Sequence, residues 1–292
     1  MDYLVRAVDI DGNIKISAVI TTDIVEKARV THSLSKTASA ALGRTLSVGV
    51  IMAEALKNEN DSITINIKGD GDIGRIVVSG KNDGNIKGYV ENPLADTDSR
   101  VIDNKLDVGK LVGNGTLTVV TDLGLKEPYV GQVQLVSGEI AEDFANYFYT
   151  SDQVPSVVSL GVLVDTDYTI KAAGGFVLQL LPGAEEEIIS KIEKNLKDLD
   201  SVTSMISDGY LPEDIIKRVL SGFEVKILSV KKIYYNCDCS REKVEDAIIS
   251  LGKKELEEIL KTDKKAEMKC YFCNKTYELN EAELKSLVDK ID

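Results

Sequence analysis

Residues 62–92, SITINIKGDGDIGRIVVSGKNDGNIKGYVEN, contain three β-branched runs separated by short stretches rich in Gly, Asp and Asn. Such runs are typical of antiparallel strands joined by turns. The first turn also matches the spacing Gly-x-Gly-x-x-Gly, at Gly69, Gly71 and Gly74. A nucleotide site would need a helix after this motif to receive the phosphates, whereas RIVVSG continues as a strand. We therefore predict a hairpin here, within an antiparallel sheet.

The sequence on either side of this stretch extends the same pattern. YLVRAVDI (3–10) and IKISAVI (14–20) flank the hairpin signal Asp11-Gly12, and a helical stretch runs from about Thr22 to Leu56. Further strand-like runs cover residues 116–122, 129–137, 157–165 and 168–181, with one helix predicted at 138–153. The acidic segment 95–107 lacks the Gly and terminal Glu of a calcium loop, so we expect a solvated connector. Short strands with few helices predict an α+β domain over residues 1–182.

Composition limits the possible function classes. The 292 residues suggest about two domains, and 43% hydrophobic residues can form a sizeable core. The net charge of −13 disfavours nucleic acids and anionic membranes as partners. The sequence has neither an apolar run of about 18 residues nor a signal-peptide pattern at its start, so we expect a soluble, cytosolic protein. His32 is the single histidine, which disfavours a catalytic triad or a multi-histidine metal site; we interpret it as a surface or packing residue.

The composition changes after Pro182-Gly183. Residues 184 to about 229 are predicted to be helical, and the first helix carries a narrow apolar stripe of Ile188, Ile192, Leu196 and Leu199 on a charged rod. Such a stripe must pack against another surface, and we expect that surface to be the strand-rich domain.

All four cysteines lie in the last segment, as Cys237-Asp-Cys239 and Cys270-Tyr-Phe-Cys273. In a cytosolic chain, two close pairs favour a Zn²⁺ site over a disulfide framework, because four thiolates can surround the ion tetrahedrally. Ser240 is positioned to cap a helix at 241–251, GKKELEEILK is predicted to form a second helix, and Asn280 with Glu283 resembles a capping box. A module of about 60 residues rarely has enough core to fold alone, so a structural zinc would supply the deficit.

The same cysteines are compatible with redox switching. Their thiolates remain nucleophilic toward oxidants, and disulfides hold zinc poorly. Oxidation would therefore release the metal and remove most of the module's folding energy.

Several stretches together resemble the redox-regulated holdase of bacteria, the 33 kDa chaperonin family. They are KGDGDIGRI (68–76), GYVENP (88–93), GEIAEDFANYFYTSDQVP (138–155), AAGGFVLQLLPGA (172–184) and the sequence around both cysteine pairs. The resemblance covers nearly the whole chain. Tyr271 stands where many members carry His, but that position is not a zinc ligand in the family.

The resemblance implies a chaperone core domain (1–182), a metastable helical linker (183–232) and a redox-sensing zinc domain (233–292). It implies one Zn²⁺ per reduced chain, held by Cys237, Cys239, Cys270 and Cys273. It also implies that oxidation pairs Cys237 with Cys239 and Cys270 with Cys273, releases zinc and unfolds the linker. The active form would be a dimer that holds unfolding client proteins without ATP, and the reduced form a monomer; the protein would be cytoplasmic and not an enzyme.

Two alternatives remain open at this stage. A zinc module that binds nucleic acid is disfavoured by charge, because residues 233–292 hold 11 Lys and Arg against 14 Asp and Glu. A thiol–disulfide oxidoreductase would place Cys270-Tyr-Phe-Cys273 at a helix N-terminus, whereas the flanking residues look strand-like.

Overall fold

The computed structural model of the chain describes residues 1–103 and 105–291. Contacts divide it into two compact units, Met1–Asn236 and Cys237–Asp292. Helices and antiparallel strands occur in both units, which confirms the predicted α+β class. None of the described helices combines the length and apolar character that crossing a bilayer requires.

The first unit contains a five-stranded sheet in the order β10-β1-β2-β9-β8. Its strands are β1 (Tyr3–Asp9), β2 (Ile14–Ile20), β8 (Ser156–Val164), β9 (Ile170–Leu180) and β10 (Val225–Lys232), and all neighbours are antiparallel. The turn between β1 and β2 holds the predicted Asp11-Gly12 signal, with Gly12 at φ 76°.

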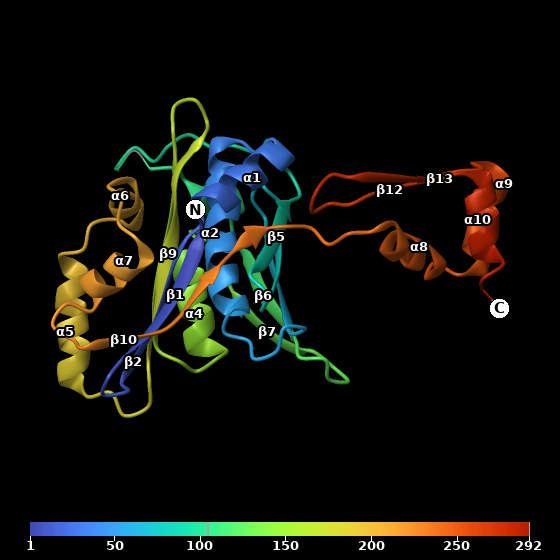
Figure 1. Cartoon of the computed structure of the whole chain (residues 1–292). Helices are drawn as coiled ribbons and strands as arrows, with labels where there is room; N and C mark the ends of the chain where they lie inside the picture. Colours follow the sequence, from blue (N-terminus) through green and yellow to red (C-terminus); the bar gives the residue numbers. More distant parts are fainter. Residues whose placement is uncertain (104, 292) are drawn as a thin grey trace. The chain divides into compact units, whose positions relative to one another are not determined.

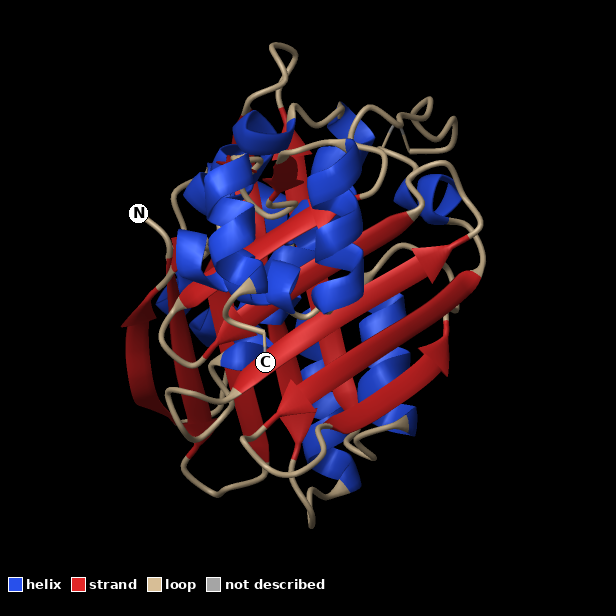
Figure 2. Ribbon diagram, turned by 90° about the vertical axis from the view of Figure 1, so that its right-hand side faces the viewer, coloured by secondary structure: helices blue, strands red, loops and turns tan. Residues whose placement is uncertain are grey.

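A second sheet of six strands has the order β11-β5-β4-β3-β6-β7. Its strands are β3 (Ser62–Gly69), β4 (Arg75–Lys81), β5 (Asn85–Val90), β6 (Gly115–Asp122), β7 (Tyr129–Gln134) and the short β11 (Tyr234–Tyr235). Figure 2 draws the strands of the molecule in red and its helices in blue. β3 and β4 pair antiparallel from Ser62–Lys81 to Lys68–Arg75, so the glycine-rich motif is a hairpin turn as predicted. β11 runs parallel to β5.

Helices fill the space between the two sheets. The predicted helical stretch 22–56 forms two helices, α1 (Thr22–His32) and α2 (Lys36–Ala53), because Ser33 adopts a left-handed conformation (φ 54°) and Ser35 caps α2 by accepting from the Ala38 N–H. α2 is buried almost all round and contacts strands of both sheets. A Cβ at Gly43 would lie 2.7 Å from Val25 and Val162, so this glycine permits the close packing. Figure 1 shows α2 between the sheets.

A different helical layer covers the other face of the five-stranded sheet (Figure 1). It consists of α5 (Glu186–Lys197), α6 (Val202–Ser207) and α7 (Pro212–Val219). The stripe joins an apolar cluster with sheet residues such as Val5, Ile16 and Phe176: Ile192 is 3% exposed, while Ile188 and Leu196 are partly buried. Leu199 packs on the same cluster, but it follows the end of α5 at Lys197, so the predicted helix is shorter than expected. The prediction that the stripe lies on the strand-rich domain is confirmed.

The segment after α7 differs from the prediction. Helix was expected to about residue 229, but α7 ends at Val219 and β10 begins at Val225, where it pairs with β1. Residues 183–232 thus belong to the first unit by their contacts. Their separate role as a linker stays a prediction.

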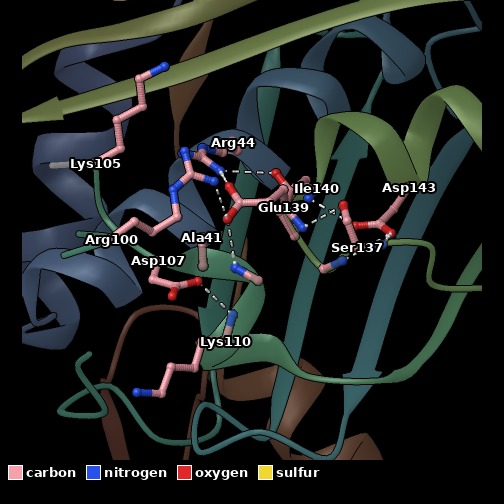
Figure 3. Close-up of polar contacts among 12 residues, drawn as sticks. Ala41, Arg44, Arg100, Lys105, Asp107, Lys110, Ser137, Glu139, Ile140 and Asp143 are labelled. Carbon is pink, nitrogen blue, oxygen red and sulfur yellow. Dashed lines mark hydrogen bonds and ion pairs between the residues drawn. The ribbon is translucent and has the colours of Figure 1, made fainter. Parts of the chain in front are cut away.

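A cluster of charged side chains fixes the connector 95–107 to the rest of the first unit (Figure 3). Glu139 accepts from Arg44 of α2 at 2.6 Å, from Arg100 of the connector at 3.4 Å and from the Gly109 N–H at 3.0 Å. Asp143, in the first turn of α4 (Ala141–Thr150), accepts from backbone N–H groups of residues 136–138 and 140. These contacts give residues 138–143 a structural role. Val101 and Ile102 are fully exposed, as expected of a solvated connector; Asn104 lies outside the described residues.

The second unit contains α8 (Arg241–Ile249), α9 (Lys253–Thr262), the hairpin of β12 (Ala266–Lys269) and β13 (Thr276–Leu279), and α10 (Glu281–Val288). Both predicted caps are confirmed. Ser240 accepts from the Lys243 N–H, and Asn280 and Glu283 form a capping box.

Candidate metal centre

One pair of cysteines lies on the turn between β12 and β13. The Cys270 N–H donates to the carbonyl of Lys275 at 2.9 Å, and the Asn274 N–H donates to the carbonyl of Cys270 at 2.8 Å. Asn274 closes the turn in the left-handed region (φ 60°). This tight loop presents the thiols of Cys270 and Cys273 from a single turn, as expected of a metal-binding knuckle.

The other pair immediately precedes α8. Lys243, in the first turn of the helix, donates to the Asp238 carboxylate at 2.6 Å and to the Asp238 carbonyl at 3.0 Å. Together with the cap at Ser240, these bonds fix the chain on both sides of Cys239.

The structure brings all four predicted ligands together. Their sulfurs lie within 4.8 Å of one another, with Cys237 Sγ 3.6 Å from Cys270 Sγ and Cys239 Sγ 3.4 Å from Cys273 Sγ. Four sulfurs at about 2.3 Å from a tetrahedral Zn²⁺ would be about 3.8 Å apart, so the arrangement fits the ion after small adjustments. Among the described residues, this is the one group of three or more candidate ligands so close together.

The sulfurs do not share one protonation state in the absence of metal. Burial raises the pKa values of Cys237 and Cys273. Burial also opposes ionisation of Cys239, but hydrogen bonds from Tyr277 and the neighbouring thiols outweigh it and lower the pKa of Cys239 to about 7. A metal that needs four thiolates must therefore displace protons when it binds.

Tyr277 is a site residue that sequence analysis missed. Its hydroxyl donates to Cys239 Sγ at 3.2 Å, and this bond raises the pKa of Tyr277 to about 12. Lys275 lies over the Tyr277 ring, with Nζ 4.9 Å from the centroid. Tyr277 and Leu279 alternate with exposed residues on β13, so strand periodicity was the available signal that Tyr277 points inward.

The apolar core of the second unit is small. Among its described residues, 237–291, seven hydrophobic side chains are buried: Val244, Ile248, Leu256, Tyr277, Leu279, Leu284 and Leu287. Cys239 and Cys270 pack against this cluster, so the metal site is continuous with it. A core of this size leaves the unit dependent on an additional stabilising interaction, which a bound metal would supply.

The residues just before Cys237 are fixed to the first unit. Tyr235 is buried, its hydroxyl donates to the Gly88 carbonyl at 2.7 Å, and His32 Nε2 lies 3.0 Å from that hydroxyl. Because the hydroxyl hydrogen points to Gly88, His32 must donate through Nε2. Lys27 Nζ also donates to the carbonyl of Tyr235 at 2.8 Å. His32 is thus a buried packing residue, as predicted.

The four cysteines are free thiols in this structure. Each of the two sulfur–sulfur distances given above separates a cysteine of the first sequence pair, Cys237 and Cys239, from a cysteine of the second pair, Cys270 and Cys273. In a tetrahedral cluster every sulfur is near the other three, so these distances do not select a disulfide pairing. The pairing of Cys237 with Cys239 and of Cys270 with Cys273 stays a prediction.

Comparisons with known proteins agree across the whole chain. The family model described as Hsp33 protein matches residues 2–280. A 33 kDa chaperonin of Desulforamulus reducens is 47% identical over 291 residues, covering 100% of this chain and 98% of the relative. A 33 kDa chaperonin of a Thermoanaerobacter species is 48% identical over 288 residues, with 98% of each chain covered.

A solved structure is also similar. The crystal structure of the 33 kDa chaperonin (heat shock protein 33 homolog) of Thermotoga maritima superposes with a TM-score of 0.90 at 39% identity. The superposition covers 99% of this chain and 98% of that one. These relatives are named as chaperonins and not as enzymes.

Proposed function

The chain belongs to the Hsp33 family, and from this membership we propose that it is a redox-regulated, ATP-independent holdase that binds unfolding proteins under oxidative stress. The observation that carries the proposal is the four-cysteine cluster, because it makes the folding of a small unit depend on the state of its thiols. The names of the relatives support a chaperone that acts without catalysis.

In the reduced state, Cys237, Cys239, Cys270 and Cys273 would hold one Zn²⁺ per chain. The donor set of four thiolates supports zinc over magnesium or calcium, which prefer oxygen ligands. The ion would supply folding energy to the second unit, on the order of 10–16 kcal/mol in small zinc modules at neutral pH.

Oxidation would remove that energy. Each disulfide forms when two thiolates lose two electrons to a two-electron oxidant such as hypochlorite or a peroxide, so four thiolates need two equivalents. The proposed products are Cys237–Cys239 and Cys270–Cys273, with release of zinc. Each disulfide closes a very short loop, which restricts the unfolded chain too little to replace the metal.

Unfolding of the second unit would then loosen residues 183–232. Within this segment, α5, α6 and α7 cover the apolar face of the five-stranded sheet that includes Val5, Ile16 and Phe176. Exposure of this face would provide a binding surface for unfolding clients, and we expect a monomer when reduced and a dimer when oxidised. We also propose that the protein acts in the cytoplasm, where thiols are kept reduced until stress.

The structure weakens the oxidoreductase alternative, because Cys270 and Cys273 lie between two strands and not at a helix N-terminus. The nucleic-acid alternative stays disfavoured by the acidic charge of residues 233–292, and Arg241 and Lys243 of the second unit are paired with carboxylates.

The test measures zinc release, free thiols and client aggregation on the same sample, before and after hypochlorite. We expect one zinc and four thiols before oxidation, and loss of both together with suppression of aggregation afterwards. A Cys270→Ser/Cys273→Ser variant, which lacks two of the four ligands, should hold no zinc and suppress aggregation before hypochlorite is added. Equal suppression by the reduced, zinc-loaded protein would refute the proposal.

A further inference from the structure

Met205 is the most deeply buried of the four methionines in the chain. Its side chain is 2% exposed, whereas Met1 is 81% exposed and Met52 and Met268 are partly buried. A methionine thioether is oxidised to a polar sulfoxide, and this conversion disrupts apolar cores. Because the reaction needs access to the sulfur, oxidants reach Met1 in the folded chain but not Met205.

Met205 lies on α6, a helix that needs tertiary contacts to form. α6 has six residues, and isolated helices shorter than about 12–15 residues are marginal in water. Val202 and Met205, three positions apart, are its two buried residues. Both belong to the apolar cluster that joins α5, α6 and α7 to the five-stranded sheet. The position of α6 on the sheet thus depends largely on these two side chains.

The packing between α6 and the sheet leaves little space for an added atom. A Cβ at Gly161 of β8 would lie 2.6 Å from Thr203 Cγ2. A Cβ at Gly174 of β9 would lie 2.7 Å from Ile206 Cδ1. Glycine therefore permits the close approach of α6 to both strands, and a larger side chain at Met205 would force the helix away. A sulfoxide would also have to give up its hydrogen bonds to water on entering the apolar cluster, which costs free energy.

We propose that Met205 is a second oxidation site of the chain, protected while α6 lies on the sheet and converted to the sulfoxide when the helix detaches. For the event that detaches α6, the oxidation of the cysteines, the proposal rests on the proposed function. Once oxidised, Met205 would no longer fit between α6 and the sheet. Residues 183–232 would then stay open after the disulfides are reduced and zinc is returned. Closure would need methionine sulfoxide reductases, of which one type acts on each sulfoxide epimer.

The oxidation of Met205 consumes one molecule of oxidant, in addition to the two that the four thiolates need. The thioether sulfur loses two electrons and takes the oxygen atom of the oxidant. With hypochlorous acid, the O–Cl bond breaks, the S–O bond forms, and chloride and a proton leave. With hydrogen peroxide, the O–O bond breaks and water leaves.

The first test follows the order of oxidation by peptide mass spectrometry. The reduced, zinc-loaded full chain is treated with hydrogen peroxide, and the sulfoxides at Met1 and Met205 are measured beside zinc release and amide exchange. We expect sulfoxide at Met1 from the start, and a rate at Met205 that is at least tenfold higher after zinc release than before it. Sulfoxide at Met205 as early as at Met1 would overturn the proposal.

The second test opens the chain with urea, so that it does not depend on the cysteines. It uses Met52→Leu/Met268→Leu, in which sulfoxides at two other packed positions cannot impair refolding, and the same chain with Met205→Leu added. Leucine replaces methionine at similar volume. Both chains are oxidised with hydrogen peroxide in urea, diluted into dithiothreitol and zinc, and compared by amide exchange.

We expect the chain with Leu at position 205 to regain amide protection over residues 202–219. The chain that retains Met205 should exchange at least tenfold faster there, until sulfoxide reductases for both epimers are added. Strands β3, β4 and β6 should be protected in both chains, which shows that the first unit has refolded.

Equal protection of residues 202–219 in the two oxidised chains would overturn the proposal, because the sulfoxide would then fit. If zinc release opens residues 183–232 but the two chains still refold alike, the proposed function stands and this inference fails. If the two chains differ as expected but zinc release leaves residues 183–232 protected, the opening step of the proposed function fails. Met205 would then remain an oxidation site that blocks closure of α6.

Discussion

Tyr277 shows how a single hydroxyl can tune the candidate metal centre. Its bond to Cys239 Sγ stabilises the thiolate, and outer partners of this kind are typically worth 10–100-fold in metal affinity. We predict that Tyr277→Phe raises the pKa of Cys239 from about 7 and weakens zinc binding by about that factor. Competition with a chromophoric chelator measures the effect.

Tyr234→Phe is the matched control, because it removes an exposed hydroxyl outside the second unit. Equal zinc affinity for Tyr277→Phe and the unmodified chain would show that the hydroxyl does not act on the metal site.

Asp2, in the first unit, gives a pH-dependent prediction. Burial raises the pKa of Asp2 from 3.8 to about 6, although its carboxylate accepts from the Ile24 N–H at 2.7 Å. Because the folded state holds this proton more tightly than the unfolded state, the group's contribution is fully present below about pH 4 and is lost as pH rises through about 6. The unfolding free energy falls by about 3 kcal/mol over this range, because the pKa of Asp2 lies about two pH units above its ordinary value.

Asp2→Asn should therefore show a smaller fall in unfolding free energy between pH 4 and pH 7 than the unmodified chain. Urea unfolding followed by circular dichroism measures the difference. Glu59→Gln, at an exposed carboxylate that is not among the groups acting on Asp2, should leave the fall unchanged. An unchanged fall for Asp2→Asn would contradict the assignment.

Individual residues show which functional roles can be predicted from a sequence pattern and which cannot. The four cysteines were predictable, because structural zinc sites use few residue types as ligands and usually take them from closely spaced pairs in the sequence. Tyr277 and Asp2 were not, because their roles depend on contacts with Cys239 and Ile24 that no spacing rule encodes.

Among the elements, α5 provides the sharpest test of the proposed linker. Its Ile192 is 3% exposed, and Ile192→Asp should lose about 1.5–3 kcal/mol of burial and add the cost of a buried charge. We predict faster amide exchange over residues 186–219 and chaperone activity that needs less oxidant. Ser190→Asp adds the same charge on the exposed side of the helix and should do neither.

If Ile192→Asp keeps the oxidant dependence of the unmodified chain while its amide exchange rises, α5 is not the element that restrains activity.

Element types were predictable where the local pattern agrees with the tertiary role. The β3–β4 hairpin, the caps of α8 and α10 and the stripe on α5 all follow from nearby residues. β10 could not be predicted in this way, because it forms a strand by pairing with β1, which lies near the start of the sequence. The break between α1 and α2 was missed since it rests on the left-handed conformation of Ser33, a residue type that does not require it.

For the whole molecule, the two units should differ in their response to metal removal. We predict that a strong zinc chelator abolishes amide protection over residues 237–291, because seven buried side chains cannot replace the energy of the metal. Strands β3, β4 and β6, whose core is far larger, should stay protected.

Re-addition of zinc with reductant should restore protection and serves as the control. Retained protection over residues 237–291 after complete zinc removal would show that the second unit folds without metal.

The pairing of β1 with β10 also sets the order in which the protein can be completed during synthesis. β1 is made first, yet its outer edge has to wait for residues 225–232 to leave the ribosome. At about 5–20 residues per second this wait lasts roughly 10–40 s. A nascent chain of this protein thus carries an open strand edge on β1 until residues 225–232 have emerged, and an open edge can pair with other chains for as long as it lasts.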